Sequence, residues 1–410
     1  MKHERFSHPQ TSVEQLDANG LRKLDALEWD SLAAEALVEN PFYSRQYVLA
    51  GLDTVDANAG IRALAIRDRH GELIGLFPYR TRHLPFPTGD ASRNVYQPNS
   101  TPLVHRNHAE KAIGAWLDAA GPRFWQLAHV PLDPVFIEHF EAALRTRNQR
   151  SHVVNAYERP ILTRMQGGLE EHLTQVIAKS RLKDIRRNLR RLEEQGDVAF
   201  EQAREPDLVA RRFDQFLAME HAGWKGDTGT SFLAHEESAN FARAAFSAHV
   251  QAGLVSIDSL LLDGKPIAMS VNLRARDVAF AAKCAYDENY RRFSPGLVLE
   301  YLVIEAFYAD EQTAAMDACT MAEGHVISGF WNDSLPMGTL IVGPDDWRTD
   351  TLAAIVEQTH TGRERLKRAL RHLPLRRWAE RVQDVSKRHQ YVHWTAGLSA
   401  ALTVAALYAE

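Results

Sequence analysis

Apolar and polar residues follow the same pattern in two stretches of the chain that lie half a chain length apart. Residues 63–80 read ALAIRDRHGELIGLFPYR, and residues 259–276 read SLLLDGKPIAMSVNLRAR. In each stretch, two apolar runs flank a turn that contains glycine, which is the pattern of a β-hairpin. Gly71 in the first turn corresponds to Gly264 in the second, at an offset of 193 residues. A hairpin that recurs at this spacing predicts two similar domains in tandem.

The first predicted domain comprises residues 1–162 and alternates helices with strands. Spaced leucines predict a helix that ends before Asn40 and Pro41. Residues 83–102 are rich in Pro, Gly and Asn, so we expect a loop or an irregular sheet edge there. The pattern after this loop predicts helices at 108–119 and 135–147 and strands at 124–130 and 152–157. Such alternation is typical of a layered α/β fold.

The second predicted domain comprises residues 163–345. It opens with one long helix over 169–195, which Gly196 ends. Further helices are expected at 207–221, 236–252 and 294–308, and strands at 198–201, 254–262, 266–274, 278–286, 315–319 and 338–342. The last of these strands is expected to close the edge of the sheet. Residues 346–410 are expected to form a helical tail.

Composition narrows the class of function. Of the 410 residues, 45% are hydrophobic and 25% are charged, as in an ordinary globular protein. The net charge of −5 argues against a dedicated nucleic-acid-binding protein. Cys284 and Cys319 are the only cysteines, so we expect two free thiols and a reducing, cytoplasmic location. Residues 1–20 contain no apolar run typical of a secretory signal.

The end of the chain is basic and then apolar. Residues 361–394 contain ten Lys or Arg and three acidic residues, and residues 395–409 carry no charge. A membrane-spanning helix needs about 20 apolar residues, so this Ala-rich segment is too short to span. Two interpretations stay open: a helix docked on the protein, or an amphipathic anchor on acidic lipid. We therefore expect a cytoplasmic protein, with peripheral contact at the inner face of the membrane as the alternative.

Five segments of the second domain carry a resemblance to a known family. They are SRLKDIRRNLRRLEEQGDV, FLAMEHAGWKGDTGT, LLLDGKPIAMSVNL, AYDENYRRFSPGLVLEYLVIEA and MDACTMAEGH. Over residues 167–343, the chain resembles the GNAT-like acetyltransferase domain of the CelD-type cellulose-biosynthesis proteins. A weaker likeness in the first domain rests on WDSLAAE, NPFYSRQY and GELIGLFPYR. The chain is thereby similar to the tandem-GNAT Fem-type transferases.

The resemblance implies a fold and a reaction. The fold would be α/β (α+β layered), with two tandem GNAT-like domains whose mixed sheets are mainly antiparallel, and a C-terminal helical tail. The reaction would transfer an acyl group from acetyl-CoA or another acyl-CoA to an amine or hydroxyl of a saccharide or cell-envelope precursor. One departure lies in the segment AEGHVISGFWND, where many relatives have a Tyr-Lys pair. That role is either unfilled here or taken by His325 and Trp331.

The turn before the last long helix of the second domain is the candidate donor site. A strand is expected to end at Tyr286, a basic turn contributes Arg291 and Arg292, and a helix opens at Ser294. A helix N-terminus offers unpaired N–H groups to a phosphate, and Gly296 lets the backbone approach a ligand closely. The resemblance implies that this turn holds the diphosphate of coenzyme A. An ordinary capped helix is the alternative.

The resemblance also implies direct attack by the acceptor in a ternary complex. Backbone N–H groups of Lys283, Cys284 and Ala285 would polarise the thioester carbonyl. Histidine is suited to accept a proton near neutral pH, so His325 is a candidate general base, with Asp317 as the group that orients it.

Other residues near these segments are candidates for the acceptor site. Those that would bind the acceptor are Trp224, Lys225, Tyr286 and Trp331. Trp224 can stack on a sugar face, or it can be a core residue packed against the sheet. Glu220, one helical turn before Trp224, is a candidate second base. A Cys319–His325 nucleophile pair is an alternative to direct attack.

A helix over 179–191 carries seven basic residues. It is either a solvated surface or a site for an anionic substrate, including tRNA as in the Fem-type interpretation. The sequence has no metal-ligand cluster, P-loop or Rossmann motif, so we expect no metal and no permanently bound cofactor. We predict an acyl-CoA-dependent N- or O-acyltransferase that does not bind DNA. The alternatives are aminoacyl-tRNA-dependent transfer and a non-catalytic GNAT scaffold of an exopolysaccharide machine.

Overall fold

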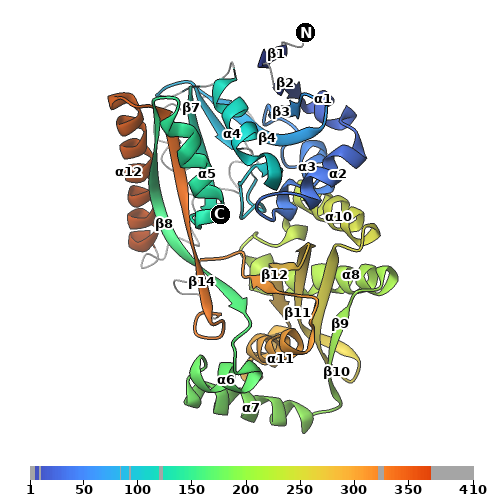
Figure 1. Ribbon diagram of the computed structural model, residues 1–410. Helices are drawn as coiled ribbons and strands as arrows, with labels where there is room; N and C mark the ends of the chain where they lie inside the picture. Colours follow the sequence, from blue (N-terminus) through green and yellow to red (C-terminus); the bar gives the residue numbers. More distant parts are fainter. Residues whose placement is uncertain are drawn as a thin grey trace, which may run out of the picture.

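The computed structural model describes residues 5–8, 11–83, 85–91, 94–119, 123–321 and 327–370. Figure 1 shows two lobes, and the strands of both belong to one sheet. Two long strands run from one lobe to the other, and a C-terminal helix lies beside them.

The first lobe is built from residues 5–145. Its strands are β1 (Arg5–His8), β2 (Thr11–Asp17), β3 (Arg62–Asp68), β4 (Leu73–Arg82), β5 (Thr88–Ala91), β6 (Leu103–Val104) and β7 (Phe124–Pro131). Its helices are α1 (Ala18–Lys23), α2 (Ala26–Ala34), η1 (Pro41–Tyr43), α3 (Arg45–Asp53), η2 (Arg106–His108), α4 (Ala109–Asp118) and α5 (Pro134–Arg145). The hydrophobic pattern did not predict β1, β2 or α3. Ser44 starts α3 as an N-cap, because its hydroxyl accepts a hydrogen bond from the Tyr47 amide.

The second lobe follows the predicted order of helices and strands. Its helices are α6 (Gly168–Gln175), α7 (Lys179–Glu193), α8 (Pro206–Ala222), α9 (Trp224–Asp227), η3 (Phe232–Ala234), α10 (Glu236–Gln251), η4 (Glu288–Phe293) and α11 (Pro295–Ala309). Its strands are β9 (Val198–Ala203), β10 (Val255–Leu262), β11 (Lys265–Ala275), β12 (Val278–Tyr286) and β13 (Ala315–Asp317). The long strands between the lobes are β8 (Gln149–Thr163) and β14 (Asp333–Pro344), and the C-terminal helix is α12 (Trp347–Leu370).

The sheet is mixed and mainly antiparallel, as predicted. Its strand order is β1-β2-β3-β4-β5-β7-β14-β8-β13-β12-β11-β10-β9, with β6 paired to β4. The parallel pairs are β5–β7 and β12–β13. The prediction that the last strand closes an edge is wrong, because β14 lies between β7 and β8. Every residue from Met337 to Gly343 is buried, which fits a central strand because such a strand is covered on both faces.

The predicted helix over 169–195 is also wrong in one respect, since α6 and α7 are separate helices. Ala178 precedes α7 with a ψ of 134°, which is extended rather than helical. Ile177 is 2% exposed and packs in the core under α11. No proline or glycine marks this break, so burial of one side chain decides it and the local pattern does not.

The tandem repeat is confirmed at the level of strand pairing. Both hairpins, β3–β4 and β10–β11, turn through a glycine with positive φ, 86° at Gly71 and 75° at Gly264. Gly75 of β4 pairs with Val104, and at the same offset of 193 residues Ala268 of β11 pairs with Tyr286. Each lobe then adds a short parallel pair, β5–β7 in the first and β12–β13 in the second. The two lobes are therefore copies of one architecture.

The two lobes share a core. Phe42 and Tyr47 of the first lobe pack with α8, α10 and the β10–β12 strands of the second. His249 on α10 is fully buried, and its Nε2 lies 2.8 Å from the Ser44 hydroxyl. Its Nδ1 lies 2.6 Å from the Ala245 carbonyl oxygen, which only accepts, so Nδ1 carries the proton and Nε2 accepts from Ser44.

This histidine makes the lobe interface sensitive to acid. Burial lowers the pKa of His249, so the folded protein binds a proton there less readily than the unfolded chain. We expect the melting temperature to fall as the pH drops below about 6.5, until the lowered pKa of His249 is reached. His249→Gln should flatten this decline in part, because the pKa of His172 is lowered too. Melts of both proteins between pH 8 and 5 test this, and identical curves would contradict it.

The helix α12 packs on β8 and β14. Within the ranges described, no helix combines the length and the apolar composition that a membrane span needs. The predicted basic and apolar tail beyond residue 370 lies outside the described residues, so docking on the protein or on lipid stays a prediction for it.

Candidate functional site

The strand β12 has two different edges. Along β11 it is paired from Val278 to Tyr286, whereas along β13 it is paired only from Val278 to Phe280. Because β13 ends at Asp317, the edge of β12 from 281 to 286 has no strand partner in the part of the chain that the structure describes. We call this stretch the open edge. Main-chain groups on such an edge can pair with an extended ligand.

Cys284 places its main-chain groups on the open edge. Lys225 Nζ donates a hydrogen bond to the Cys284 carbonyl oxygen over 2.7 Å. The N–H and C=O of one strand residue point to the same edge, so the Cys284 N–H also faces away from β11. An N–H in this position can polarise a carbonyl group placed beside it. As predicted, Cys284 and Cys319 are free thiols, and that of Cys284 is exposed.

The carboxylate of Glu220, on α8, holds two lysines beside the open edge. Its Oε1 accepts hydrogen bonds from Lys283 Nζ at 2.8 Å and Lys225 Nζ at 3.5 Å, and its Oε2 accepts from the Phe232 amide at 2.8 Å. The Glu220 side chain is 0% exposed. Burial lowers the pKa of Lys283, and the charge of Glu220 opposes that shift. Two ammonium groups against one carboxylate leave positive charge beside the edge.

The turn that follows β12 leads directly into α11. Ser294 has a φ of 49°, the left-handed region, which costs a non-glycine residue about 1–2 kcal/mol. A Cβ built on Gly296 would meet only the Tyr286 ring, 3.9 Å away, so the first turn of α11 is open to an approaching group. The Gly296 amide has no main-chain partner among the described residues. Such an amide at a helix N-terminus suits an anion.

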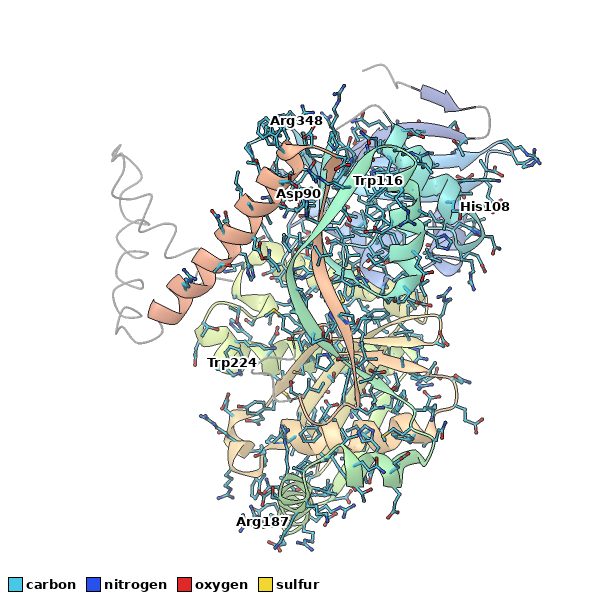
Figure 2. The ribbon with its side chains drawn as sticks, turned by 60° about the vertical axis from the view of Figure 1, so that its left-hand side comes forward. Asp90, His108, Trp116, Arg187, Trp224 and Arg348 are labelled. Atoms are coloured by element: carbon cyan, nitrogen blue, oxygen red, sulfur yellow. The ribbon has the colours of Figure 1, made fainter. Side chains whose placement is uncertain are left out.

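The predicted arginines lie on η4, just before this helix. Arg291 and Arg292 are both exposed, and the Arg292 guanidinium lies 4.6 Å from the centre of the Phe293 ring. Neither forms an ion pair with a residue that the structure describes. The helix α7 packs against η4 and exposes most of its basic residues. These exposed residues are Lys179, Lys183, Arg186, Arg187, Arg190 and Arg191, and Figure 2 labels Arg187 at the end of the lobe.

Glu300, on the second turn of α11, was not among the predicted site residues. Its Oε1 accepts a hydrogen bond of 2.5 Å from the indole N–H of Trp331, which is 6% exposed. Burial raises the pKa of Glu300 to about 7, the bond from Trp331 lowers it, and Asp258 raises it. Glu300 also interacts electrostatically with the Cys284 thiol. A glutamate inside the apolar run from Leu297 to Leu302 was the available signal.

Asp317 is held at the end of β13. Its Oδ2 lies 3.3 Å from a guanidinium nitrogen of Arg159, and its Oδ1 accepts a hydrogen bond of 2.6 Å from the Cys319 amide. Arg159 is 1% exposed and also donates to Pro98 of the first lobe. Burial and Asp317 raise the pKa of Cys319, which disfavours the thiolate that a Cys–His pair needs. The predicted partner His325 lies outside the described residues.

Trp224 is exposed, which corrects the alternative that it fills the core. It is 53% exposed at the start of α9, and Figure 2 shows it at the surface of the second lobe. Gly223 separates α8 from α9, and Lys225 on α9 reaches the open edge. Trp331, by contrast, is a core residue bonded to Glu300.

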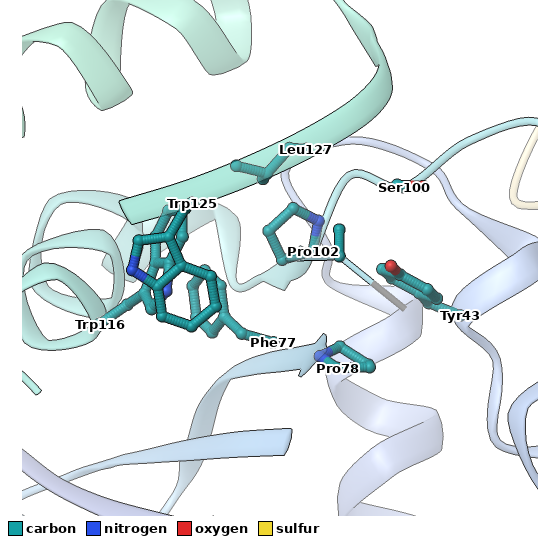
Figure 3. Close-up of a pocket in the computed structure, with 9 residues that line it drawn as sticks. Tyr43, Phe77, Pro78, Ser100, Pro102, Trp116, Trp125 and Leu127 are labelled. Atoms are coloured by element: carbon teal, nitrogen blue, oxygen red, sulfur yellow. The ribbon is translucent and has the colours of Figure 1, made fainter. Parts of the chain in front are cut away.

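Among its described residues, the first lobe has no counterpart of the open edge. Residues 94–102 separate β5 from β6, although the register shows that these two strands together correspond to β12. The corresponding cleft is packed with aromatic rings and leaves a cavity of only about 10 Å³. Figure 3 shows its lining, with Trp116, Trp125 and Phe77 on one side and Pro102 and Tyr43 on the other.

Residues 94–102 pack against the second lobe instead. The ring of Tyr96 lies 5.5 Å from Lys283 Nζ and 4.9 Å from the Phe232 ring. The Tyr96 carbonyl oxygen accepts a hydrogen bond of 2.6 Å from the Tyr47 hydroxyl. Tyr96 of the first lobe thus lies beside the pair formed by Lys225 and Lys283.

Among the described side chains, no group of three His, Cys, Asp or Glu residues could hold a metal ion.

Several solved structures share this fold. FemX matches with a TM-score of 0.52 at 11% identity, over 82% of this chain and 98% of that chain. The C-terminal domain (DUF2156) of a proposed lysylphosphatidylglycerol synthetase from Agrobacterium fabrum matches with a TM-score of 0.50 at 13% identity, over 82% of this chain and 95% of that chain. At these identities, the likeness concerns the fold alone.

No curated protein matches the chain. A family model described as an acetyltransferase (GNAT) domain, that of the CelD-like family, matches residues 179–325. The matched range contains α7, the open edge of β12, the turn after it and α11. Residues 179–325 therefore match the acetyltransferase domain of the GNAT-type acyltransferases.

Proposed function

We propose that the protein transfers an acyl group from an acyl-CoA to an amine or hydroxyl of a saccharide or cell-envelope precursor, by direct attack in a ternary complex. The observation that carries this proposal is the open edge of β12, which ends at a basic turn and a helix N-terminus. A thioester placed along this edge has a main-chain N–H beside its carbonyl, and its diphosphate has cations within reach.

The donor would be held at its charged end. The Gly296 amide and the positive end of the α11 dipole face the same turn as Arg291 and Arg292. Charge-assisted hydrogen bonds from such groups are the strong ones in proteins. The Cys284 N–H would stabilise the oxyanion, and the neighbouring lysine charges favour its negative charge.

The acceptor would bind on the α9 side of the open edge. Trp224 offers an exposed ring to a sugar face, and Lys225 offers a cation next to the Cys284 carbonyl. Tyr286, at the end of β12, lies beside the donor turn, and we propose it as a further contact for the acceptor. Stacking of this kind needs an aromatic face that solvent can reach, which Trp224 has.

Glu220 and Asp317 are fully or nearly fully buried and face cations, so we propose that they position other groups. Glu220 would hold Lys225 and Lys283 at the edge, and Asp317 would fix the chain after β13. His325 remains a proposal from the sequence as a group that binds or deprotonates the acceptor.

The experiment is a transfer assay on the full-length protein. Release of the coenzyme A thiol is measured with acetyl-CoA and longer acyl-CoAs, with glucosamine and other amino sugars as acceptors. We expect acceptor-dependent thiol release. Donor binding without release for any acceptor would favour the scaffold alternative, and use of charged tRNA without acyl-CoA would favour aminoacyl transfer.

A further inference from the structure

We propose that the acceptor is an acidic sugar, with a carboxylate or a phosphate on its ring, and that Lys225 recognises this charged group beside the open edge. This inference rests on the proposed function and goes beyond it by naming the chemical class of the acceptor. It is carried by the position of one ammonium group, which bonds to the open edge and lies next to the exposed ring of Trp224.

A hydrogen bond places Lys225 at the open edge. Its Nζ donates to the Cys284 carbonyl oxygen over 2.7 Å, and Cys284 is the residue whose N–H would hold the oxyanion. The acceptor must bring its amine or hydroxyl to the thioester carbon beside that N–H. A charged group elsewhere on the same sugar can therefore reach the Lys225 ammonium.

The carboxylate that faces Lys225 is committed to other donors. Glu220 Oε1 lies 2.8 Å from Lys283 Nζ, and its Oε2 lies 2.8 Å from the Phe232 amide. The distance from Oε1 to Lys225 Nζ is longer, 3.5 Å. A close ammonium–carboxylate hydrogen bond is about 2.7–2.9 Å long, so Lys283 has that bond and Lys225 does not. Glu220 thus compensates the charge of Lys225 only in part.

Two further acids lie near Lys225 without pairing with it. Asp227 is exposed on α9, and a Cβ built on Gly223 would meet the side chain of Glu288 at 3.9 Å. Neither carboxylate comes within ion-pair distance of Lys225, whose one ion pair among the described residues is the long one to Glu220. The positive charge of Lys225 is therefore available to an acidic ligand.

The ammonium group also has a donor left for a ligand. It carries three N–H groups, of which one bonds to the Cys284 carbonyl and one faces Glu220. The Lys225 side chain is 22% exposed, so a dissolved molecule can contact it. Lys283, by contrast, is held by Glu220 and lies 4.1 Å from the centre of the Phe232 ring. Of the two lysines, Lys225 is thus the one suited to bind the acceptor.

Trp224 provides a contact for the uncharged part of the same acceptor. The centre of its ring lies 6.0 Å from Lys225 Nζ, the outer limit of a cation–π contact, so the ring holds the ammonium only weakly. A sugar stacked on Trp224 can place a substituent at the ammonium, where an anion forms a charge-assisted hydrogen bond. The ring would bind acidic and neutral sugars alike, and Lys225 would favour the acidic ones.

Three amino sugars that differ only at C6 test the proposal: glucosamine, glucosamine 6-phosphate and glucosaminuronic acid. Calorimetry measures their binding to the full-length protein at one ionic strength, with coenzyme A present. We expect an acidic sugar to bind at least about tenfold more tightly than glucosamine, the effect of one charge-assisted hydrogen bond. The comparison of the two acidic sugars shows whether the preferred anion is a phosphate or a carboxylate.

Four variants assign the preference to its source. Lys225→Gln should bind all three sugars equally weakly, whereas Lys225→Arg should keep the preference because it keeps the charge. Lys111→Gln removes an exposed charge on α4 of the first lobe and should behave as the wild-type protein. Trp224→Ala should weaken the binding of all three sugars by a similar factor, since stacking does not depend on the C6 group. Thermal melts confirm that each variant is folded.

The possible failures are distinguishable. Equal affinity for the three sugars in the wild-type protein overturns the proposal without the use of any variant. A preference that persists in Lys225→Gln also overturns it, because the charge then acts from another residue. If an acidic sugar binds through Lys225 but releases no coenzyme A thiol from acetyl-CoA, the assignment of Lys225 stands and the proposed function is overturned instead.

Discussion

Replacement of Cys284 by proline is expected to lower kcat for acyl transfer about 10²- to 10³-fold, the effect of removing one oxyanion donor. Proline has no main-chain N–H, so the variant loses the group that would polarise the thioester. The Cys284 N–H faces the open edge, so no ladder bond to β11 is lost. A strand edge without a partner is also where proline is tolerated.

Cys284→Ala is the control, since it removes the thiol and keeps the N–H. Its kcat should stay close to that of the wild-type protein. Steady-state kinetics at saturating acetyl-CoA compare the three proteins, with thermal melts to confirm that each is folded. Unchanged kcat in folded Cys284→Pro would refute the role of this N–H. An equal loss in Cys284→Ala would assign the effect to the thiol.

Glu220→Gln is expected to destabilise the protein by about 3–5 kcal/mol at pH 7, as when one partner of a buried ion pair is removed. Glutamine can still accept from the Phe232 amide, but it offers no charge to Lys283, whose side chain is only 17% exposed. The lowered pKa of Lys283 should fall further in the variant. The unfolded state then binds more protons, so the variant should regain stability as the pH rises toward about 10.4. Urea unfolding at several pH values measures this.

Two variants make that result specific. Glu201→Gln breaks a partly exposed pair with Arg212, so it should cost less than about 1 kcal/mol. Adding Lys283→Met to Glu220→Gln should recover most of the loss, because methionine fits between the rings of Phe232 and Tyr96 without a charge. If Glu220→Gln is as mild as Glu201→Gln, the lysine pair does not depend on this carboxylate.

Much of the fold could be predicted because local patterns encode it. The hairpins around Gly71 and Gly264 carry their turn chemistry in the sequence, and the strand register confirms the repeat. The position of β14 could not be predicted, because pairing with β7 and β8 is decided by contacts about 200 residues away in the chain. The break at Ile177 depends likewise on a core that only the folded chain creates.

The site was predictable in outline and less so in its proton chemistry. A strand, a basic turn and a proline-started helix can be recognised locally, and the structure places them in that order. Whether a carboxylate can act as a base depends on its burial and its hydrogen-bond partners, which cannot be read from the sequence. Glu220 and Asp317 thus seemed available as bases, although cations face both.

The central claim is that an acyl-CoA lies along the open edge with its diphosphate at the η4–α11 turn. Calorimetric titration of acetyl-CoA into the wild-type protein and Arg292→Glu tests it most directly, with Arg69→Glu, on the exposed β3–β4 turn, as a control of equal charge change. We predict binding to the wild-type protein and to Arg69→Glu, and at least about tenfold weaker binding to Arg292→Glu, since a charge-assisted bond contributes about 1.5–3 kcal/mol. Equal affinity in all three proteins, or no binding of any acyl-CoA to the wild-type protein, would contradict it.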